Sequence, residues 1–220
     1  MAVYQLDDDL WFPDPHLGEP DGMIAVGGDL SVDRLILAYS NGFFPWFSFQ
    51  HQAEPVWYCP LQRFVIFPDE IHVSHSMRQL INRQQYAVTF NRDFEGVIRG
   101  CATAQNRNQE EGAWLGPDII SAYSELHRQG FAVSVEVWAE HRLVGGLYGV
   151  NIGSAFFGES MFSLVPNASK LALIHLAHTF LEFGGTLIDC QLETPHLRSM
   201  GARYIPYDEY IRLIQSDDND

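Results

Sequence analysis

The sequence predicts an α+β layer fold for the 220 residues of the chain. Three strand-like segments follow one another closely, at 132–138, 142–150 and 154–162, and short polar turns separate them. This spacing is typical of antiparallel hairpins. A long helical segment then leads to a buried strand that ends at Asp189. Hairpins followed by a helix and a strand pack as layers in α+β proteins.

The first 60 residues look irregular, because proline, glycine and aromatic residues crowd this part of the chain. One helix is expected at 31–40, where apolar residues recur with helical spacing and Ser31 is suited to cap the N-terminus. We therefore expect two domains, a small N-terminal α+β domain at 1–62 and a larger domain at 63–220.

The larger domain alternates between strands and helices. Strands are expected at 63–67, 86–90 and 186–189, in addition to the three hairpin strands. Helices are expected at 74–83, 93–101, 118–129, 168–183, 195–200 and 207–214. Asn167 is placed to cap the longest of these helices, and Gly184 and Gly185 end it.

Charge and cysteine content limit the possible functions. The chain has 13 basic and 28 acidic residues and a formal net charge of −15, which argues against broad nonspecific binding of nucleic acid. Its three cysteines lie far apart and form no C-x-x-C pair, which indicates a reducing compartment and hence the cytoplasm. No apolar run is long enough to span a membrane, so we expect no membrane contact. We also expect a monomer.

The order of the elements resembles the N-acetyltransferase-like fold. In that fold the strands before and after the long helix splay apart, the acyl donor lies in the gap, and the strand that ends at Asp189 would lie beside it. Acetyl-CoA enzymes hold the donor pyrophosphate with a glycine-rich stretch before this helix. The corresponding stretch here, SLVPNASK at 163–170, has no glycine. We therefore expect neither acetyl-CoA nor another cofactor.

Polar residues stand in two apolar strands. Asp189 and Gln191 are two residues apart, so alternation places both on one face of their strand. Two interpretations are possible. The two residues form a catalytic pair, or Asp189 only caps the turn at 194–198.

Glu159 also interrupts an apolar strand, where a charge costs free energy unless it is paired or functional. One interpretation is an ion pair with Arg203 or Lys170, and the other is a functional carboxylate. Alternation places Glu159 and Met161 on one face of the strand and Phe156 and Phe162 on the other.

Two further patterns are weaker. His175, His178 and Glu182 share a helical face, but a solvated polar face is favoured over a metal site because no further ligands accompany them. A nucleophilic Cys190 assisted by His196 is also disfavoured, because Cys190 should point away from its polar neighbours and into packing.

Aromatic residues gather on the loops. Four of them lie at 43–47, and Trp114 follows an acidic stretch. Each can be a core residue. Flat aromatic side chains on loops are also the groups that stack on unpaired bases.

Several segments in series resemble one known family. They are MIAVGGDL (23–30), NGFFPWFS (41–48), EEGAWL (110–115), VGGLYGV (144–150), FFGESMFS (156–163), NASKLAL (167–173), LIDCQ (187–191) and HLRSMGA (196–202). In this order and spacing they are similar to the leucyl/phenylalanyl-tRNA–protein transferases, from about Phe12 to the last helix.

The resemblance implies a reaction and its partners. Members of the family transfer leucine or phenylalanine from Leu-tRNA or Phe-tRNA to proteins with an N-terminal Arg or Lys, which marks them for N-end rule degradation. Methionine is a further candidate for the transferred residue. The implied fold is an N-acetyltransferase-like C-terminal domain with a small N-terminal domain, and the implied donor is an RNA ester, with no cofactor and no metal.

The same resemblance assigns the residues that bind the donor. Trp46 and Trp114 match positions at the 3′-terminal adenosine, and Tyr39 and Tyr123 match aromatic positions near it. Six residues match the wall of an apolar pocket for the leucyl or phenylalanyl side chain: Leu147, Phe156, Met161, Leu173, Leu176 and Phe180.

Asp189 and Gln191 match the pair assigned to catalysis, and Glu159 and Asp189 are expected to attract the basic acceptor. The reaction is aminolysis of an activated ester, and the attacking amine has a pKa of about 8, so a weak base suffices. Our hypothesis is that Gln191 binds this amine through its carbonyl oxygen and that Asp189 orients Gln191. Arg78 and Arg83, which share a predicted helix, are expected to contact the tRNA backbone.

Two alternative functions remain. An acyl-CoA-dependent N-acyltransferase would share the fold, although the stretch without glycine argues against it. A non-catalytic binder of peptides that begin with Arg or Lys would need the acidic residues but not Trp46 and Trp114.

Overall fold

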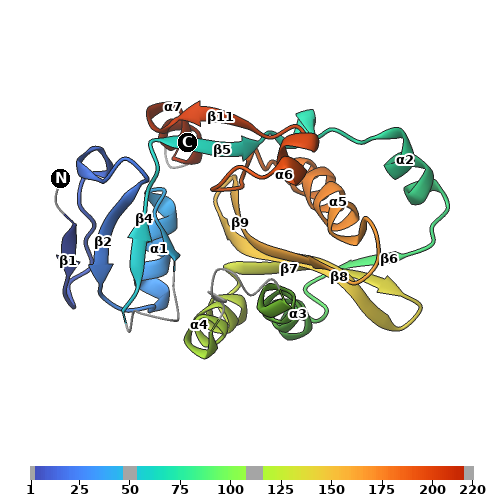
Figure 1. Ribbon diagram of the computed structural model, residues 1–220, viewed down its shortest axis with the longest axis horizontal. Helices are drawn as coiled ribbons and strands as arrows, with labels where there is room; N and C mark the ends of the chain where they lie inside the picture. Colours follow the sequence, from blue (N-terminus) through green and yellow to red (C-terminus); the bar gives the residue numbers. More distant parts are fainter. Residues whose placement is uncertain (1–2, 47–53, 108–115, 216–220) are drawn as a thin grey trace.

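The computed structural model describes residues 3–46, 54–107 and 116–215. Its elements form two β-sheets with helices packed on and between them (Figure 1). The mixed α+β class predicted from the sequence is confirmed.

The N-terminal sheet has the strand order β1-β2-β4-β3. Its strands are β1 (Tyr4–Leu6), β2 (Met23–Gly27), β3 (Phe44–Trp46) and β4 (Val56–Tyr58). The region is therefore more regular than expected. Its strands were not predicted, because segments of three to five residues between prolines and glycines are too short to display a two-residue period. The expected helix is α1 (Val32–Ser40), and Ser31 caps it by accepting a hydrogen bond from the Arg34 amide.

The larger sheet has the strand order β11-β5-β10-β9-β8-β7-β6. Its strands are β5 (Gln62–Ile66), β6 (Ala87–Phe90), β7 (Ala132–Ala139), β8 (Arg142–Ile152), β9 (Ala155–Ser163), β10 (Leu187–Asp189) and β11 (Arg203–Pro206). The two predicted hairpins, β7–β8 and β8–β9, are confirmed as antiparallel pairs. Only β9 and β10 run parallel in this sheet, among the described residues.

Helices cover both faces of the larger sheet (Figure 1). On one face lie α3 (Phe94–Arg107) and α4 (Pro117–Arg128), and on the other lie α5 (Ala168–Glu182) and α2 (His75–Asn82). The remaining helices are α6 (Pro195–Ser199), α7 (Tyr207–Ile214) and the short 3-10 turns η1 (Pro15–Leu17) and η2 (Pro68–Glu70).

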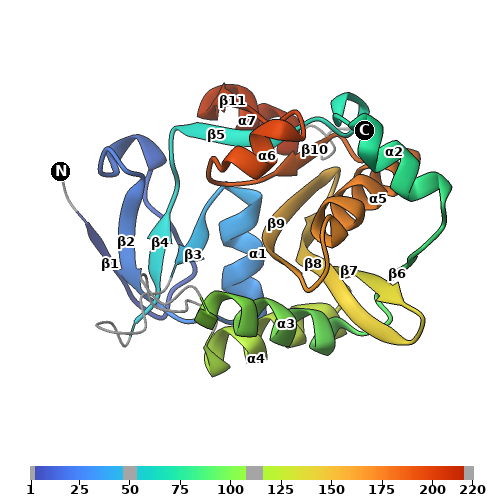
Figure 2. The ribbon, with the colours of Figure 1, turned by 45° about the vertical axis from the view of Figure 1, so that its right-hand side comes forward.

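The helix α1 connects the two sheets. Figure 2 shows it between β3 and β9, and it contacts β3, β8 and α4. Tyr39 of α1 is buried in the same apolar cluster as Phe157 of β9 and Tyr123 of α4. The N-terminal sheet is therefore joined to the larger sheet through a continuous core, and this junction leads to the site.

Within the described ranges, every helix is too short or too polar to cross a membrane.

Candidate functional site

A cavity of about 620 Å³ opens where β9 and β10 separate. The parallel pairing of these strands stops at Phe157 and Asp189. Beyond that point β9 continues along β8, whereas the chain after β10 turns away. The cavity lies in this gap, between the ends of the two strands and the helix α5.

The inner wall of the cavity is apolar. Five of the six predicted pocket residues line it: Leu147, Phe156, Met161, Leu173 and Leu176. Phe180, the sixth, lies outside the lining and packs edge-on against the Phe156 ring, with 6.1 Å between the ring centroids. Phe180 therefore supports the wall from behind.

Glu159 reaches the cavity because β9 contains a β-bulge. In the β8–β9 ladder Tyr148 pairs with Ser160, but Gly149 pairs with Gly158, so Glu159 has no partner across the ladder. A bulge bends its strand and re-aims the extra side chain, and such features recur beside functional sites. Glu159 consequently lines the cavity, although it stands in an apolar strand.

The bulge also reverses the alternation of side chains along β9. Phe156, before the bulge, and Met161, after it, both pack on the α5 side of the sheet, whereas Phe162 packs on the opposite side. The prediction that Phe156 and Phe162 share a face is therefore wrong. It assumed an unbroken two-residue period across Glu159.

Three side chains donate hydrogen bonds to the Glu159 carboxylate. Tyr39 donates to Oε1 at 2.7 Å, Gln191 Nε2 donates to Oε1 at 2.8 Å, and Tyr123 donates to Oε2 at 3.1 Å. Burial raises the pKa of Glu159 to about 7, although these three hydrogen bonds act to lower it. Glu159 is therefore poised to gain or lose a proton near neutral pH.

Neither predicted cationic partner binds Glu159. Arg203 forms an ion pair with Glu70 at the surface instead, and Lys170 makes no ion pair among the described residues. The interpretation of Glu159 as half of a structural salt bridge is thus wrong, and its partners are hydroxyl and amide groups.

Tyr39 and Tyr123 lie beneath Glu159, away from the mouth of the cavity. Their exposed fractions are 1% and 0%, their hydroxyl oxygens contact each other, and neither side chain lines the cavity. Burial raises the pKa of both phenols well above the ordinary value, so they remain hydrogen-bond donors. The two tyrosines, expected near the 3′-terminal adenosine, thus reach the cavity only through Glu159.

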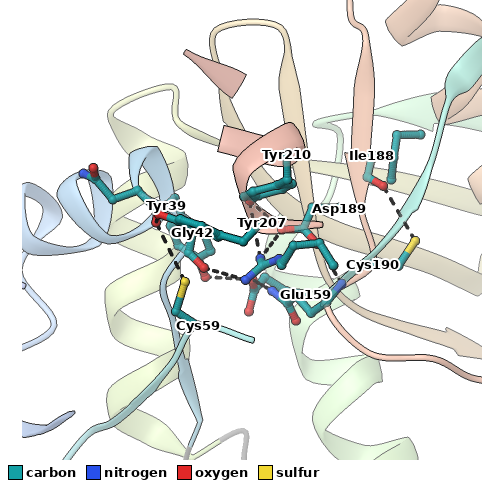
Figure 3. Close-up of polar contacts among 12 residues, drawn as sticks. Tyr39, Gly42, Cys59, Glu159, Ile188, Asp189, Cys190, Tyr207 and Tyr210 are labelled. Carbon is teal, nitrogen blue, oxygen red and sulfur yellow. Dashed lines mark hydrogen bonds and ion pairs between the residues drawn. The ribbon is translucent and has the colours of Figure 1, made fainter. Parts of the chain in front are cut away.

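Asp189 is buried on the side of β10 that faces away from the cavity. Its Oδ2 atom accepts hydrogen bonds from Arg63 and, at 2.8 Å, from the Tyr210 hydroxyl (Figure 3). Its Oδ1 atom accepts the backbone N–H of Gln191 at 2.8 Å. The exposed fraction of Asp189 is 0%, and the Arg63 guanidinium compensates its charge. Asp189 is therefore not placed to attract a cationic acceptor by direct contact.

Gln191 and Asp189 point in different directions. The strand ends at Asp189, and Gln191 has a left-handed backbone with φ of 61°. The side chain of Gln191 lines the cavity and reaches Glu159, whereas Asp189 holds the Gln191 backbone. The prediction that both side chains share one face of the strand is wrong. Asp189 does contact Gln191, but it does so through the backbone N–H of Gln191.

Asp189 does not cap the following turn. Thr194 caps α6, because its Oγ1 atom accepts a hydrogen bond from the Leu197 amide at 3.1 Å.

Cys190, expected to point into packing, lines the cavity together with Gln191. Burial raises the pKa of its thiol, so it is protonated and unsuited to act as a nucleophile.

The mouth of the cavity is aromatic. Phe44, Pro45 and Trp46 of β3 line it, and the Trp46 side chain has an exposed fraction of 39%. Its ring packs at a tilt against Tyr58, with 5.7 Å between centroids. Trp46 thus presents an accessible face beside the cavity. Trp114, predicted at the same subsite, lies outside the described residues.

A polar rim, which was not predicted as part of the site, lies near α5 and α6. It consists of Ser169, Thr194 and His196. Burial lowers the pKa of His196, so its ring is neutral at pH 7. These residues come from the N-terminal ends of the two helices, which only the fold brings together.

Arg78 on α2 and Arg83, the C-cap residue of that helix, are exposed at the end of the molecule away from the N-terminal sheet (Figure 1). No ion pair with either residue is found in the described part of the chain. Both guanidinium groups are thus available to an anionic partner.

No cluster of three or more His, Cys, Asp or Glu side chains suited to hold a metal ion occurs in the described ranges. His178 and Glu182 of α5 are exposed, and His175 is half-buried.

An apolar cavity that ends at a carboxylate and an amide, with an accessible indole at its mouth, is suited to hold an apolar group and to exchange a proton beside it. The family model of the leucyl/phenylalanyl-tRNA protein transferases matches residues 65–215, and the model of their N-terminal domain matches residues 28–61. The chain belongs to the leucyl/phenylalanyl-tRNA protein transferase family.

Curated relatives are similar along nearly the whole chain. The leucyl/phenylalanyl-tRNA–protein transferase of Syntrophobacter fumaroxidans is 47% identical over 97% of this chain and 90% of that protein. The one from Pseudomonas fluorescens is 51% identical over 93% of this chain and 90% of its own length. Among solved structures, L-PGS from Bacillus licheniformis is 12% identical with a TM-score of 0.43, over 78% of this chain and 54% of that chain. A likeness of that size supports no inference about function.

Proposed function

We propose that this chain transfers leucine or phenylalanine from an aminoacyl-tRNA to the N-terminal Arg or Lys of a protein. The proposal rests on the cavity, because its apolar wall suits these side chains and Glu159 and Gln191 stand at its polar end. The names of the relatives support the same reaction. In the family this transfer marks proteins for N-end rule degradation.

The donor side chain occupies the apolar part of the cavity in this proposal. Leu147 and Leu176, which both line it, set the size of the amino acid that fits, with methionine as a further candidate. An apolar pocket discriminates weakly between side chains that differ by a methylene group, by roughly 1–3 kcal/mol. A cavity with this wall is therefore expected to accept more than one apolar residue.

The 3′-terminal adenosine stacks on Trp46 in the proposed complex, with Trp114 as its second aromatic partner. The accessible indole of Trp46 beside the cavity supports this assignment. We assign Tyr39 and Tyr123 a different role, that of positioning Glu159 through their hydrogen bonds.

The acceptor amine meets Glu159 and Gln191. Glu159 is the only carboxylate among the described residues that line the cavity, so it is our candidate for attracting the cationic acceptor. Because the Gln191 amide nitrogen donates to Glu159, its carbonyl oxygen is the atom left to accept an N–H of the amine. Asp189 contributes by holding the Gln191 backbone.

The chemistry is the aminolysis of an ester. The acceptor nitrogen forms a bond to the aminoacyl carbonyl carbon, and the bond from that carbon to the ribose oxygen breaks. The amine loses a proton and the leaving ribose oxygen gains one, so no redox partner is required. Glu159, with a pKa of about 7, accepts a proton from an amine whose pKa is about 8 without a large energetic penalty.

The tRNA body contacts Arg78 and Arg83 in our proposal. Their exposure and freedom from ion pairs in the described part of the chain support it. The chain has 13 basic residues against 28 acidic ones, so few side chains are available to neutralise phosphate groups.

We also infer an N-acetyltransferase-like arrangement for the domain at 63–220, next to a small domain at 1–62. The parallel β9–β10 pair that opens into the cavity supports this comparison. The stretch before α5 lacks glycine, which disfavours acyl-CoA as the donor. We place the reaction in the cytoplasm, where charged tRNA and reduced cysteines coexist.

The test is transfer of radiolabelled leucine from Leu-tRNA to a peptide that begins with Arg, with an Ala peptide as the control. Transfer that depends on the N-terminal Arg would support donor, acceptor and reaction together. No transfer from Leu-tRNA, Phe-tRNA or Met-tRNA would contradict the proposal. Acyl-CoA binding by calorimetry would then favour the N-acyltransferase, and peptide binding without turnover would favour a simple binder.

A further inference from the structure

Arg63 of β5 is buried between the turn at Gln191 and the segment that leads to Trp46. Its exposed fraction is 1%, and its guanidinium binds the Asp189 carboxylate with one nitrogen. With the other terminal nitrogen, Nη1, it donates to the backbone carbonyl oxygen of Gly42 at 2.6 Å. The rings of Phe44 and Tyr210 flank it, at 5.2 Å and 4.6 Å from the guanidinium carbon.

Each end of this contact leads to a different part of the cavity. Asp189 accepts the amide of Gln191, so it fixes the residue that meets the acceptor. Gly42 lies between α1 and β3, two residues before the strand that carries Trp46 to the mouth of the cavity. One guanidinium group therefore touches both the turn at Gln191 and the segment that leads to Trp46.

Tyr210 of α7 completes the arrangement. Its hydroxyl donates to Asp189 Oδ2 at 2.8 Å, and its exposed fraction is 0%. A planar guanidinium and a phenol thus hold one carboxylate oxygen, which leaves the other oxygen directed at the Gln191 amide.

The Gln191 backbone needs this support. Its φ of 61° lies in the left-handed region, which costs free energy for a residue with a side chain and persists only where surrounding contacts enforce it. The hydrogen bond from the Gln191 amide to Asp189 helps to enforce it here, together with the hydrogen bond from the Leu192 amide to the Cys190 carbonyl oxygen, which spans Gln191. If Asp189 could rotate, Gln191 would relax and its amide would leave Glu159.

We infer that Arg63 and Tyr210 are positioning residues for the transfer reaction, which hold Asp189 so that Gln191 is presented to the acceptor amine. Arg63 also ties this turn to the segment that carries Trp46. Neither residue lines the cavity, so both act through others. The inference rests on the proposed aminoacyl transfer.

The test compares two single-atom deletions on α7. Tyr210→Phe removes the hydroxyl that binds Asp189, whereas Tyr207→Phe removes a hydroxyl that donates to the backbone carbonyl oxygen of Asn41 at 3.0 Å and does not contact Asp189. We expect Tyr210→Phe to lower kcat by about tenfold with KM for Leu-tRNA unchanged, because a hydrogen bond to a charged group is lost. The Tyr207→Phe enzyme should retain its kcat within about twofold.

A second comparison separates positioning from general stability. In an Asp189→Asn background, Tyr210→Phe should change kcat by less than about twofold, because two residues that act through one contact are not additive. Arg63→Lys keeps the charge but cannot reach Asp189 and Gly42 with one planar group, so it should lower kcat and also raise KM for Leu-tRNA.

The outcomes are distinguishable. Wild-type kcat in Tyr210→Phe, or an equal loss in the Asp189→Asn background, would overturn the inference and leave the proposed function standing. An unaltered chain that transfers no amino acid would overturn both.

Discussion

Replacing Glu159 with glutamine should change the pH dependence of transfer. The wild-type carboxylate accepts hydrogen bonds from Tyr39, Tyr123 and Gln191, and burial raises its pKa to about 7. A glutamine keeps the shape and one acceptor oxygen, and a tyrosine hydroxyl can turn to accept from the new amide. The variant is therefore expected to fold while losing the titration.

The magnitude follows from the pKa of Glu159. With a pKa of about 7, the fraction of ionised Glu159 rises from about 0.1 at pH 6 to about 0.9 at pH 8, which multiplies the rate by about ten. Deprotonation of the acceptor amine adds a second increase in rate, centred near its pKa of about 8, in both enzymes. The Glu159→Gln enzyme should lack the tenfold factor and show only the second increase.

The free energy of unfolding of the wild-type protein should fall as the pH rises, whereas the transfer rate should increase. The pKa of Glu159 is raised above its ordinary value of 4.5, so the folded state binds the proton more tightly than the unfolded state does. Its contribution to stability is complete below pH 4.5 and is lost as the pH rises through about 7, by at most about 3 kcal/mol. Relative to wild type, Glu159→Gln should therefore become more stable between pH 5 and pH 8.

The assay is single-turnover transfer of leucine to an Arg peptide at half-unit pH steps from 5.5 to 8.5, with urea unfolding at pH 5 and pH 8 as the companion measurement. Equal pH profiles for the two enzymes would refute the reasoning. A wild-type profile without an inflection near pH 7 would refute the role of burial in setting this pKa.

Three more predictions concern catalysis, selectivity and tRNA binding. Gln191→Ala and Asp189→Asn should each lower kcat by about a hundredfold with little change in tRNA affinity, measured by filter binding, and full activity in either variant would exclude the proposed pair. Leu176→Phe should reduce the cavity and shift the preference from phenylalanine toward leucine by about tenfold in kcat/KM, and an unchanged ratio would place the donor side chain elsewhere. Exchanging Arg78 and Arg83 for glutamine should weaken tRNA binding and lower the slope of log affinity against log salt by about 2, whereas an unchanged slope would exclude contacts with phosphate.

Sequence patterns identified most of the larger sheet. The hairpin strands β7, β8 and β9 have 8, 11 and 9 residues and display their period, and the shorter β5, β6 and β10 were recognised as apolar runs, whereas the four-residue β11 was missed. The helix predicted at 207–214 is α7 with the same bounds, and the hairpin strands differ from their predictions by one or two residues. The helix predicted at 93–101 extends further, to Arg107 in α3, because the polar residues after Cys101 show no apolar spacing.

The orientation of the site residues was not predictable in the same way. A bulge at Glu159 and a left-handed residue at Gln191 each shift a side chain to another face, and a strict two-residue period takes neither into account. Arg63 and Tyr210 were missed for a different reason. They lie 126 and 21 residues from Asp189 along the chain, so only the sheet order and the docking of α7 bring them together.

The bulge in β9 accommodates one extra residue in the strand. Phe156 and Met161 both face α5 because the bulge takes up one of the residues between them. Deleting Glu159 would remove the bulge and give a regular ladder in which Phe156 and Met161 still face α5 and Phe162 still faces away. The extra residue therefore supplies a carboxylate to the cavity without exchanging the apolar faces on either side of it.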